Sequence, residues 1–345
     1  MLYSFAKPFI FALDAERAHG LTIAGLKALP LGPAPKSDPV LATTVAGLDF
    51  PNPIGMAPGF DKNGEVPDAL IRMGFGYAEV GTLTPRAQPG NPKPRIFRLP
   101  EDKAVINRLG FNNQGQEKAA PRLERMRKRM GKGVLGINIG ANKDSDDRIA
   151  DYVIGVENMA PLADYLTVNI SSPNTPGLRA LQDKGALEEL LAAVMEARGD
   201  RKVPVFLKVA PDLEPADIDD IVDVTMTQKI DALIVSNTTI TRPNLQSSNQ
   251  DETGGLSGAP LMDLALQRLK DFRAASGSQI PLIGVGGIAN AEDAYERIRA
   301  GASLVQLYTA MIYEGPTMAR MMSCGLARLL KRDGFTSVAD AVGTE

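Results

Sequence analysis

The stretch Leu282-Ile-Gly-Val-Gly-Gly-Ile288 decides the fold class of this 345-residue chain. Its apolar residues predict a short buried strand, and Gly286 and Gly287 follow at once. Glycine has no side chain to hold backbone N–H groups away from an anion, so such a strand end suits phosphate. Whether the fold is a barrel depends on how many similar runs the chain contains.

Short apolar runs recur along the chain, and helical patterns separate most of them. The eight runs are Ile54–Gly59, Tyr77–Thr82, Leu135–Gly140, Tyr165–Ser171, Val205–Ala210, Ala232–Asn237, Leu282–Gly287 and Leu304–Thr309. The clearest helical patterns are Gly185–Arg198, Glu214–Gln228, Met262–Ser276 and Ala291–Ala300. Eight β-α units predict a closed parallel barrel, the (β/α)8 TIM barrel. A doubly wound open sheet is the alternative, but the count of eight and the glycines after strands seven and eight favour the barrel.

Composition excludes several classes of protein. Apolar residues make up 44% of the chain, enough for a sizeable core, and the net charge of -3 argues against non-specific nucleic-acid binding. The single cysteine, Cys324, excludes an internal disulfide and any iron–sulfur or zinc site built mainly from cysteine, and no metal is expected. We find neither a secretory signal nor an apolar run long enough to cross a membrane.

Two regions fall outside the eight units. Thr84–Leu109 is long and rich in Pro and Arg, which predicts a functional or disordered loop after the second strand. Met1–Pro39 contains two apolar helical patterns, Ser4–Leu13 and Ala15–Leu29, and then the breaker-rich segment Pro30–Pro35. Its slight positive excess suits a membrane interface, while the alternative is a helical cap on the bottom of the barrel. The chain thus divides into an extension at 1–39 and a barrel at 40–345.

Polar side chains gather where the strands end. Lys208 sits near the end of an otherwise apolar run, so it is either a structural ion pair or a cation beside a flavin, where it would stabilise negative charge on the reduced ring. Asn138 and Asn169 end two other strands, and Ser236-Asn237-Thr238 ends the sixth. Buried amides must find partners, so this cluster indicates a site for a flat polar heterocycle.

Five motifs in this order resemble dihydroorotate dehydrogenase, in its class 2, quinone-reducing branch, over nearly the whole chain. They are Asn107–Asn113, Gly136–Gly140, Val168–Arg179, Gly254–Gly258 and Gly284–Ile288. The resemblance implies FMN as a non-covalent cofactor and oxidation of (S)-dihydroorotate to orotate in de novo pyrimidine biosynthesis. Cofactor residues carried over by motif are Pro58, Gly59, Phe60, Asp61, Lys62, Thr82, Asn138, Asn169, Lys208, Ser236, Gly258, Gly287, Tyr308 and Thr309. Substrate residues are Lys62, Asn107, Arg108, Leu109, Gly110, Phe111, Asn169, Asn174, Asn237 and Thr238.

The same resemblance assigns the catalytic base. Class 2 enzymes have serine where class 1 enzymes have cysteine, and Ser172 is the matching position. Serine is a poor base alone, so it needs a relay, and Thr175 and Phe111 lie in the motifs where the family places a water path and its gate. Without the surrounding motifs, Ser-Ser-Pro-Asn would be an ordinary turn.

The resemblance also gives the N-terminal helices a purpose, because in this family they form a tunnel for a quinone tail. His19 and Arg98 match positions near the quinone head, with Arg17 nearby. The expected acceptor is ubiquinone or menaquinone, without an iron–sulfur partner subunit. The expected location is peripheral, on the cytoplasmic face of a bacterial inner membrane.

Two other functions compete with this interpretation. One is an FMN barrel oxidoreductase for a different pyrimidine, and the other is a phosphate-ligand-binding barrel without chemistry. The motif Asn107–Asn113 argues against the first. The basic run Arg122–Lys132 is isolated in an acidic chain, so it indicates a solvated helix face rather than a nucleic-acid site.

Overall fold

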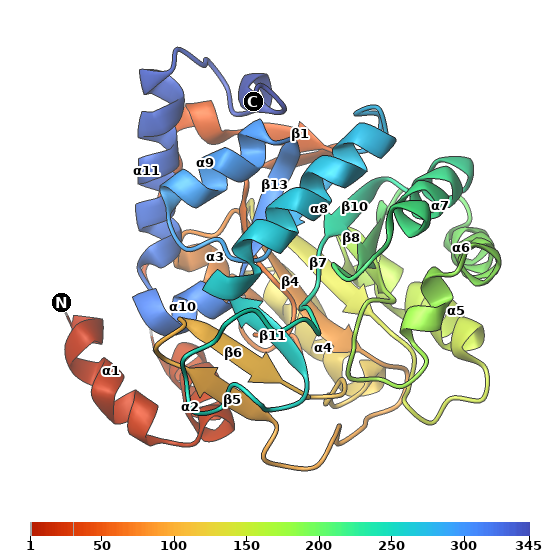
Figure 1. Cartoon of the computed structure of the whole chain (residues 1–345), viewed down its shortest axis with the longest axis horizontal. Coiled ribbons are helices and arrows are strands. Elements are labelled where there is room, and N and C mark those ends of the chain that lie inside the picture. The colour runs from red at the N-terminus through yellow and green to blue at the C-terminus, as the bar shows by residue number, and fades with distance from the viewer. Residues whose placement is uncertain (1, 30) are drawn as a thin grey trace.

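Eight parallel strands form a closed barrel in the computed structural model, which describes residues 2–29 and 31–345 (Figure 1). The strand order around the barrel is β10-β12-β13-β3-β4-β7-β8-β9. The strands are β3 (Ile54–Met56), β4 (Tyr77–Leu83), β7 (Val134–Ile139), β8 (Tyr165–Asn169), β9 (Val205–Val209), β10 (Ala232–Val235), β12 (Leu282–Val285) and β13 (Ala302–Leu307). The predicted barrel is therefore confirmed, and the open-sheet alternative is wrong. Met1 and Pro30, which fall in the predicted extension and linker, lie outside the described residues.

Helices surround the barrel and connect its strands. They are α3 (Pro67–Arg72), α4 (Gln116–Arg127), α5 (Arg148–Met159), α6 (Lys184–Arg198), α7 (Pro215–Thr227), α8 (Met262–Ala275), α9 (Ala291–Arg299), α10 (Thr309–Glu314) and α11 (Met318–Arg332). Local capping explains where several of them start. The Asp147 carboxylate accepts from the Ala150 N–H at the start of α5, and Asn290 does the same for α9 through the Asp293 N–H.

An antiparallel hairpin closes the bottom of the barrel, where the strands begin. It consists of β1 (Thr43–Val45) and β2 (Leu48–Phe50). The Phe50 ring packs edge-on against Tyr77 at 5.2 Å between centroids, and Tyr165 stacks on Phe206 at 4.4 Å. Glycine makes room for these rings, because a Cβ on Gly55 would lie 2.1 Å from the Tyr77 ring. The bottom of the barrel is thus a packed aromatic layer, not a pore.

The segment after β4 is more ordered than the sequence indicated. Thr84–Leu109 contains β5 (Ile96–Leu99) and β6 (Ala104–Asn107), which form an antiparallel sheet with β11 (Gly255–Gly258) from far along the chain. The prediction of a functional or disordered loop missed these strands. They are short, and their pairing partner β11 lies about 150 residues away, so local pattern gives little sign of them.

The two N-terminal helices are α1 (Leu2–Ala12) and α2 (Ala15–Ala28), close to the predicted ranges. They lie beside β5 and β6 at the end of the molecule opposite β1 (Figure 1). The alternative that they cap the bottom of the barrel is wrong, because β1 and β2 fill that position. Within the described residues, no helix is long and apolar enough to cross a membrane.

Candidate active site

A cavity of about 1490 Å³, including its open mouth, lies at the carboxyl ends of the barrel strands. Residues from the loops after most strands line it, together with the β5-β6-β11 sheet. The predicted site residues in its wall are Pro58, Gly59, Lys62, Thr82, Asn107, Leu109, Gly110, Phe111, Asn169, Ser172, Asn174, Lys208, Ser236, Asn237, Thr238, Gly258, Gly287, Tyr308 and Thr309. Most predicted positions therefore meet in one place, although the sequence scatters them over about 250 residues.

The buried carboxylate of Asp61 shapes the loop after β3, which carries Lys62. Asp61 accepts from the backbone N–H groups of Glu65 at 2.8 Å and Val66 at 2.7 Å. Burial raises the pKa of Asp61, while these hydrogen bonds act in the opposite direction. Asp61 thus shapes the turn instead of lining the cavity. Phe60 also lies behind the wall, where its ring packs edge-on against Tyr308.

Lys62 joins the cavity to helix α2. Its ammonium donates to the Gly59 carbonyl at 2.7 Å and contacts His19 Nε2 at 3.2 Å. Burial lowers the pKa of Lys62 to about 8 and that of His19 to about 3. A neutral imidazole therefore accepts from the ammonium at Nε2 and carries its proton on Nδ1, 3.4 Å from the Tyr308 hydroxyl. The only histidine of the chain thus contacts two cavity-wall residues.

A connected hydrogen-bond network lies beneath the cavity. Asn138 donates to Glu79 at 2.8 Å and accepts from Thr82 at 2.5 Å and Asn169 at 3.1 Å. Asn169 then accepts from the Ser171 hydroxyl at 2.7 Å. Asn138 is fully buried under the wall, so its role is to orient Thr82 and Asn169.

Lys208 is a buried cation at the end of β9. It lies in the cavity wall with 4% of its surface exposed, and it forms no ion pair with any residue that the structure describes. Burial lowers the pKa of Lys208, while the charge of Glu79 acts in the opposite direction. A structural ion pair, the alternative drawn from sequence, is therefore not formed. The ammonium therefore lies in the cavity wall without a charged partner among the described residues, which is costly unless an anionic group binds there.

The loop after β8 carries Ser172, which is 5% exposed and lies in the cavity wall. Its hydroxyl accepts from the Asn174 N–H at 3.2 Å, and the Asn174 amide approaches Asn107 at 3.4 Å. Thr175 lies just behind. Its buried hydroxyl finds no hydrogen-bond partner in the described part of the chain. A hydroxyl in this position is available to a proton path.

Some residues of the motif Asn107–Asn113 line the cavity wall, and others support the wall from behind. Phe111 lies in the wall with a φ of 53°, a left-handed conformation that is uncommon for a bulky residue and that clusters at functional sites. Arg108 does not line the cavity. Its guanidinium pairs with Glu252 at 2.6 Å and lies 4.4 Å from the Phe97 ring centroid, so it supports the β5-β6-β11 sheet.

The glycine-rich strand ends form one corner of the cavity. Gly286 and Gly287 both have positive φ, and a Cβ on Gly287 would lie 2.4 Å from the Met262 backbone. Helix α10 begins beside them at Thr309 without a side-chain cap, and the hydroxyls of Thr309 and Ser257 lie 2.8 Å apart. Close-approaching backbone, an uncapped helix start and two hydroxyls suit a phosphate group.

The three predicted quinone residues have different positions. His19 reaches the cavity wall, as described above. Arg98 is half-buried under the junction of α1 and α2, where it donates to the carbonyls of Phe11 at 3.2 Å and Leu13 at 2.9 Å. Arg17 has an exposed side chain and is not brought to the cavity.

Sequence reasoning missed several residues that hold the site together. Asn91 donates to the carbonyls of Arg108 at 3.0 Å and Asn174 at 3.2 Å. Arg95 is 6% exposed and connects this loop to α2, donating to the Asn91 carbonyl at 2.8 Å and to Glu16 at 2.7 Å. Both lie in Thr84–Leu109, whose length and Pro/Arg content pointed to function without naming a residue. The described residues contain no group of His, Cys, Asp and Glu side chains that could hold a metal ion.

Comparison with known proteins identifies the family. A family profile described as dihydroorotate dehydrogenase matches residues 40–330. The chain belongs to the dihydroorotate dehydrogenase family. A relative from Novosphingobium aromaticivorans named dihydroorotate dehydrogenase (quinone) is 63% identical, with 99% of each chain covered. One of the same name from Erythrobacter litoralis is also 63% identical, with 100% of each covered.

Solved structures of the family agree with the fold. The ligand-free enzyme from Eimeria tenella is 42% identical, with a TM-score of 0.92, and the alignment covers 96% of this chain and 99% of that one. The same enzyme in complex with ferulenol gives a TM-score of 0.91 at 42% identity, with 95% of each chain covered. Quinone-dependent members of the family use FMN as cofactor and a quinone as electron acceptor.

Proposed function

We propose that this protein oxidises (S)-dihydroorotate to orotate, passes the electrons through FMN to a membrane quinone, and uses Ser172 as the catalytic base. The step belongs to de novo pyrimidine biosynthesis. One observation carries the proposal: Ser172 lies in the wall of a cavity that also contains the amides of Asn169 and Asn174 and the ammonium of Lys208, which forms no ion pair within the described residues.

The cavity suits FMN in charge and shape. The corner around Gly287, Gly258 and Thr309 would hold the phosphate, and Tyr308 would lie beside it. Lys208 would face the pyrimidine edge of the ring with its buried ammonium. Thr82, Asn169 and Ser236 would donate or accept along the polar edge, while Asn138, Phe60 and Asp61 would act from behind the wall. When bound, FMN would supply the acceptor for the hydride removed from substrate C6.

Four amide or hydroxyl residues would hold the substrate ring, namely Asn107, Asn174, Asn237 and Thr238. Lys62 would bind the carboxylate through its ammonium, which lies in the cavity wall and has no carboxylate partner among the described residues. Leu109, Gly110 and Phe111 would cover the ring, and Arg108 would support them through Glu252. This arrangement fixes the C5–H bond toward Ser172 and keeps bulk water away.

Ser172 would take the C5 proton. The Asn174 N–H donates to the Ser172 oxygen and orients it, so a lone pair can face the substrate. As the C5 proton arrives, the proton of the Ser172 hydroxyl would leave toward Thr175, whose buried oxygen has no partner in the described chain, and pass from there to solvent along a path that Phe111 would cover. A relay of this kind lets a serine act as a base near neutral pH.

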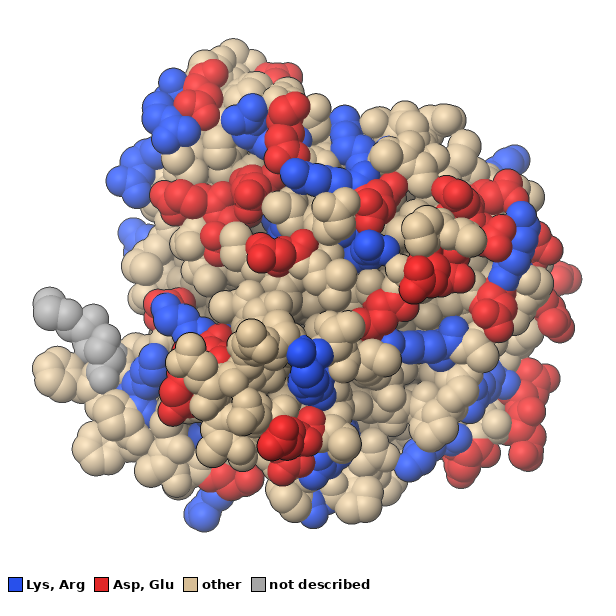
Figure 2. Space-filling model, in the orientation of Figure 1, with Lys and Arg blue, Asp and Glu red and all other residues tan. Residues whose placement is uncertain are grey.

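The N-terminal helix pair would receive the quinone and dock on the membrane surface. Phe5, Phe9, Leu21 and Leu29 are exposed on α1 and α2 at 76%, 78%, 55% and 61%. The outermost part of this helix pair, at the lower left of Figure 2, is largely uncharged, with acidic and basic groups beside it. Exposed aromatic and aliphatic side chains on a short helix pair suit the interfacial region of a bilayer. We place it on the cytoplasmic face of a bacterial inner membrane. The head of ubiquinone or menaquinone would lie near His19 and Arg98, with Arg17 at the membrane-facing surface.

Substitution Ser172→Ala tests the proposal. We expect flavin reduction by dihydroorotate to fall by well over the ~100-fold typical of a lost acid–base group, with FMN still bound. Anaerobic stopped-flow absorbance measures the rate, and the flavin spectrum of the purified protein measures cofactor content. Near-normal turnover in the variant would refute the assignment of the base. A flat rate from neutral to alkaline pH would also count against it, since deprotonating the relay helps the reaction.

Anaerobic addition of dihydroorotate separates the competing functions. A yellow protein that bleaches is the proposed enzyme. A yellow protein that bleaches only with another dihydropyrimidine is a different oxidoreductase, and a colourless protein is a binding barrel.

A further inference from the structure

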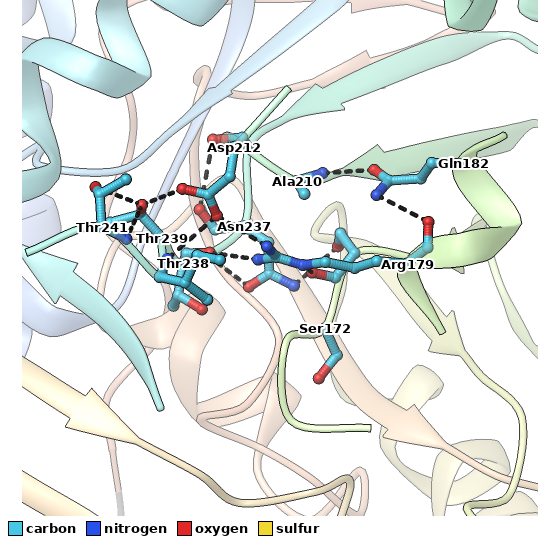
Figure 3. Close-up of polar contacts among 12 residues, drawn as sticks. Ser172, Arg179, Gln182, Ala210, Asp212, Asn237, Thr238, Thr239 and Thr241 are labelled. Carbon is cyan, nitrogen blue, oxygen red and sulfur yellow. Dashed lines mark hydrogen bonds and ion pairs between the residues drawn. The ribbon is translucent and has the colours of Figure 1, made fainter. Parts of the chain in front are cut away.

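Arg179 connects three loops at the mouth of the barrel. It follows the Ser172 loop and begins the 3-10 helix Arg179–Gln182. Its guanidinium donates to the Ser171 carbonyl at 3.1 Å, to the Asp212 carboxylate at 2.9 Å and to the Thr238 carbonyl at 3.1 Å (Figure 3). These acceptors belong to the loops after β8, β9 and β10, respectively.

Asp212 completes the connection from the loop after β9. Its carboxylate also accepts from the Ile240 N–H at 3.1 Å and from the Thr239 hydroxyl. The side chains of Arg179 and Asp212 are 22% and 11% exposed, so water competes little for the pair. Gln182 adds a contact on the other side, accepting from the Ala210 N–H at 2.9 Å. Three separate loops are thus held as one unit (Figure 3).

The contact with the Ser171 carbonyl bears directly on the base. This carbonyl belongs to the planar peptide group that joins Ser171 to Ser172, so holding it fixes the plane from which Ser172 continues and limits the directions that its side chain can take. The Ser171 hydroxyl accepts from Asn237 at 2.8 Å, and Asn237 and Thr238 line the cavity beside Ser172. The same guanidinium therefore fixes the position of Ser172 relative to Asn237 and Thr238, which are proposed to bind the substrate.

We propose that the Arg179–Asp212 pair is a positioning device that sets Ser172 against the substrate ring. This inference rests on the proposed role of Ser172. Neither residue lines the cavity, so neither contacts the reacting atoms. The three acceptors lie in different directions from the side chain. A planar guanidinium with five N–H groups can donate to all three together, whereas a lysine ammonium on a flexible chain cannot. Arg179→Lys should therefore behave much like Arg179→Met.

A double-mutant cycle tests the inference. Flavin reduction at saturating dihydroorotate is measured in the wild type, Ser172→Ala, Arg179→Met and the double variant. We expect Arg179→Met to lower the rate at least about 10-fold when Ser172 is present, because an ångström of misplacement is costly to catalysis. In the Ser172→Ala background the same change should lower the rate less than about 2-fold, because the group it positions is gone.

Each outcome of the cycle is informative. An equal loss in both backgrounds overturns the positioning role, because Arg179 then acts independently of the serine. No loss in Ser172→Ala alone refutes the proposed base instead. If Arg179→Met loses FMN, Asp212→Asn is used in the same cycle, since it removes the charge of the partner and keeps its shape.

Arg148→Met is the matched control. Arg148 donates to the Pro176 carbonyl of the same loop at 2.6 Å but touches neither Ser171 nor Asp212. We expect a change of less than about 2-fold from it. A loss equal to that of Arg179→Met would show that any disturbance of the loop slows the reaction, and would overturn the inference.

Discussion

The Ser172 loop and the N-terminal helix pair, α1 with α2, are attached to the barrel in different ways. The loop receives partly buried hydrogen bonds from several elements, including those of Arg179, Asn91 and Asn237. The helix pair is attached by side-chain contacts spread along both helices, among them the pair Glu16–Arg95, the bonds from Arg98 to two carbonyls and the contact of His19 with Lys62. It leaves Phe5 and Phe9 in contact with solvent.

This difference matches the two half-reactions. Proton and hydride removal from a small polar ring needs groups held to within a fraction of an ångström. Accepting a long apolar quinone needs an apolar surface and an entrance that can adjust. A connected polar network suits the first task, and a helix pair with exposed apolar side chains suits the second.

The largest expected effect comes from removing the helix pair altogether. Deleting residues 1–35 should spare the reduction of the flavin by dihydroorotate and abolish rapid reoxidation by a long-chain quinone. The reason is that the cavity residues all come from the barrel, apart from contacts that His19 makes behind the wall. Separate stopped-flow and steady-state assays measure the two halves. Undiminished turnover with long-chain quinone in the deletion variant would break the comparison.

The next prediction compares a phenylalanine-to-alanine substitution in the buried aromatic layer with one on the exposed face of α1. Phe206→Ala removes a fully buried ring from the aromatic layer and should destabilise the fold by about 3–5 kcal/mol. Phe9→Ala, at 78% exposure, should change stability by less than about 0.5 kcal/mol. Denaturant unfolding measures both. Vesicle sedimentation should reverse the order, with Phe9→Ala weakening binding and Phe206→Ala leaving it unchanged. A large stability loss from Phe9→Ala would mean that α1 is packed in the core.

The pH dependence of KM tests whether Lys62 binds the substrate carboxylate. Its pKa of about 8 means that the ammonium is charged below that pH and neutral above it. A neutral amine cannot pair with the substrate carboxylate, so KM for dihydroorotate should rise up to about 10-fold per pH unit above 8. The pKa of His19, about 3, predicts no change from that residue between pH 5 and 9. A KM that stays constant to pH 9.5 would exclude Lys62 as the carboxylate partner.

The smallest expected effect concerns the attachment of α2. Glu16→Gln removes the charge that pairs with the buried Arg95 and should lower the local opening free energy of α2 by about 1 kcal/mol. Hydrogen–deuterium exchange in residues 15–28 measures it. Arg95 lowers the pKa of Glu16 below its ordinary 4.5, so the pair stabilises above that pH and is lost as the pH falls through the lowered pKa.

Lys27→Gln is the matched control for this change. Lys27 also joins α2 to the barrel, through Glu65 at 3.0 Å, but its side chain is 52% exposed. Water screens that pair, so its loss should matter less than the loss of Glu16. Equal effects from both variants would show that burial of Arg95 adds nothing to the attachment.

Sequence predicted the barrel well because its strands are covered on both faces. Each strand therefore appears as an apolar run, and the predicted runs overrun the observed strands mainly at their carboxyl ends, as Ile54–Gly59 does against Ile54–Met56. Many of the overrun residues line the cavity. The small β5-β6-β11 sheet was missed because its strands pair across a long stretch of chain. Asn91, Arg95 and the contacts of Arg179 were missed for a similar reason, since their partners are backbone carbonyls, which carry no sequence signal, or carboxylates far away along the chain.

The sequence by itself determined the fold class, the family and which residue types meet at the mouth of the barrel, because strand periodicity and motif order are local properties of the chain. Only the tertiary structure decided which of those residues form the wall and which lie behind it. Asn138 and Asp61 share motifs with wall residues, yet burial and hydrogen bonding turn them into supports. The tertiary structure also decided that Lys208 has no ionic partner in the described chain. It decided as well that Arg179 donates a hydrogen bond to the carbonyl of the peptide group before Ser172. Distance and direction between loops depend on how the barrel closes, and no local pattern encodes that closure.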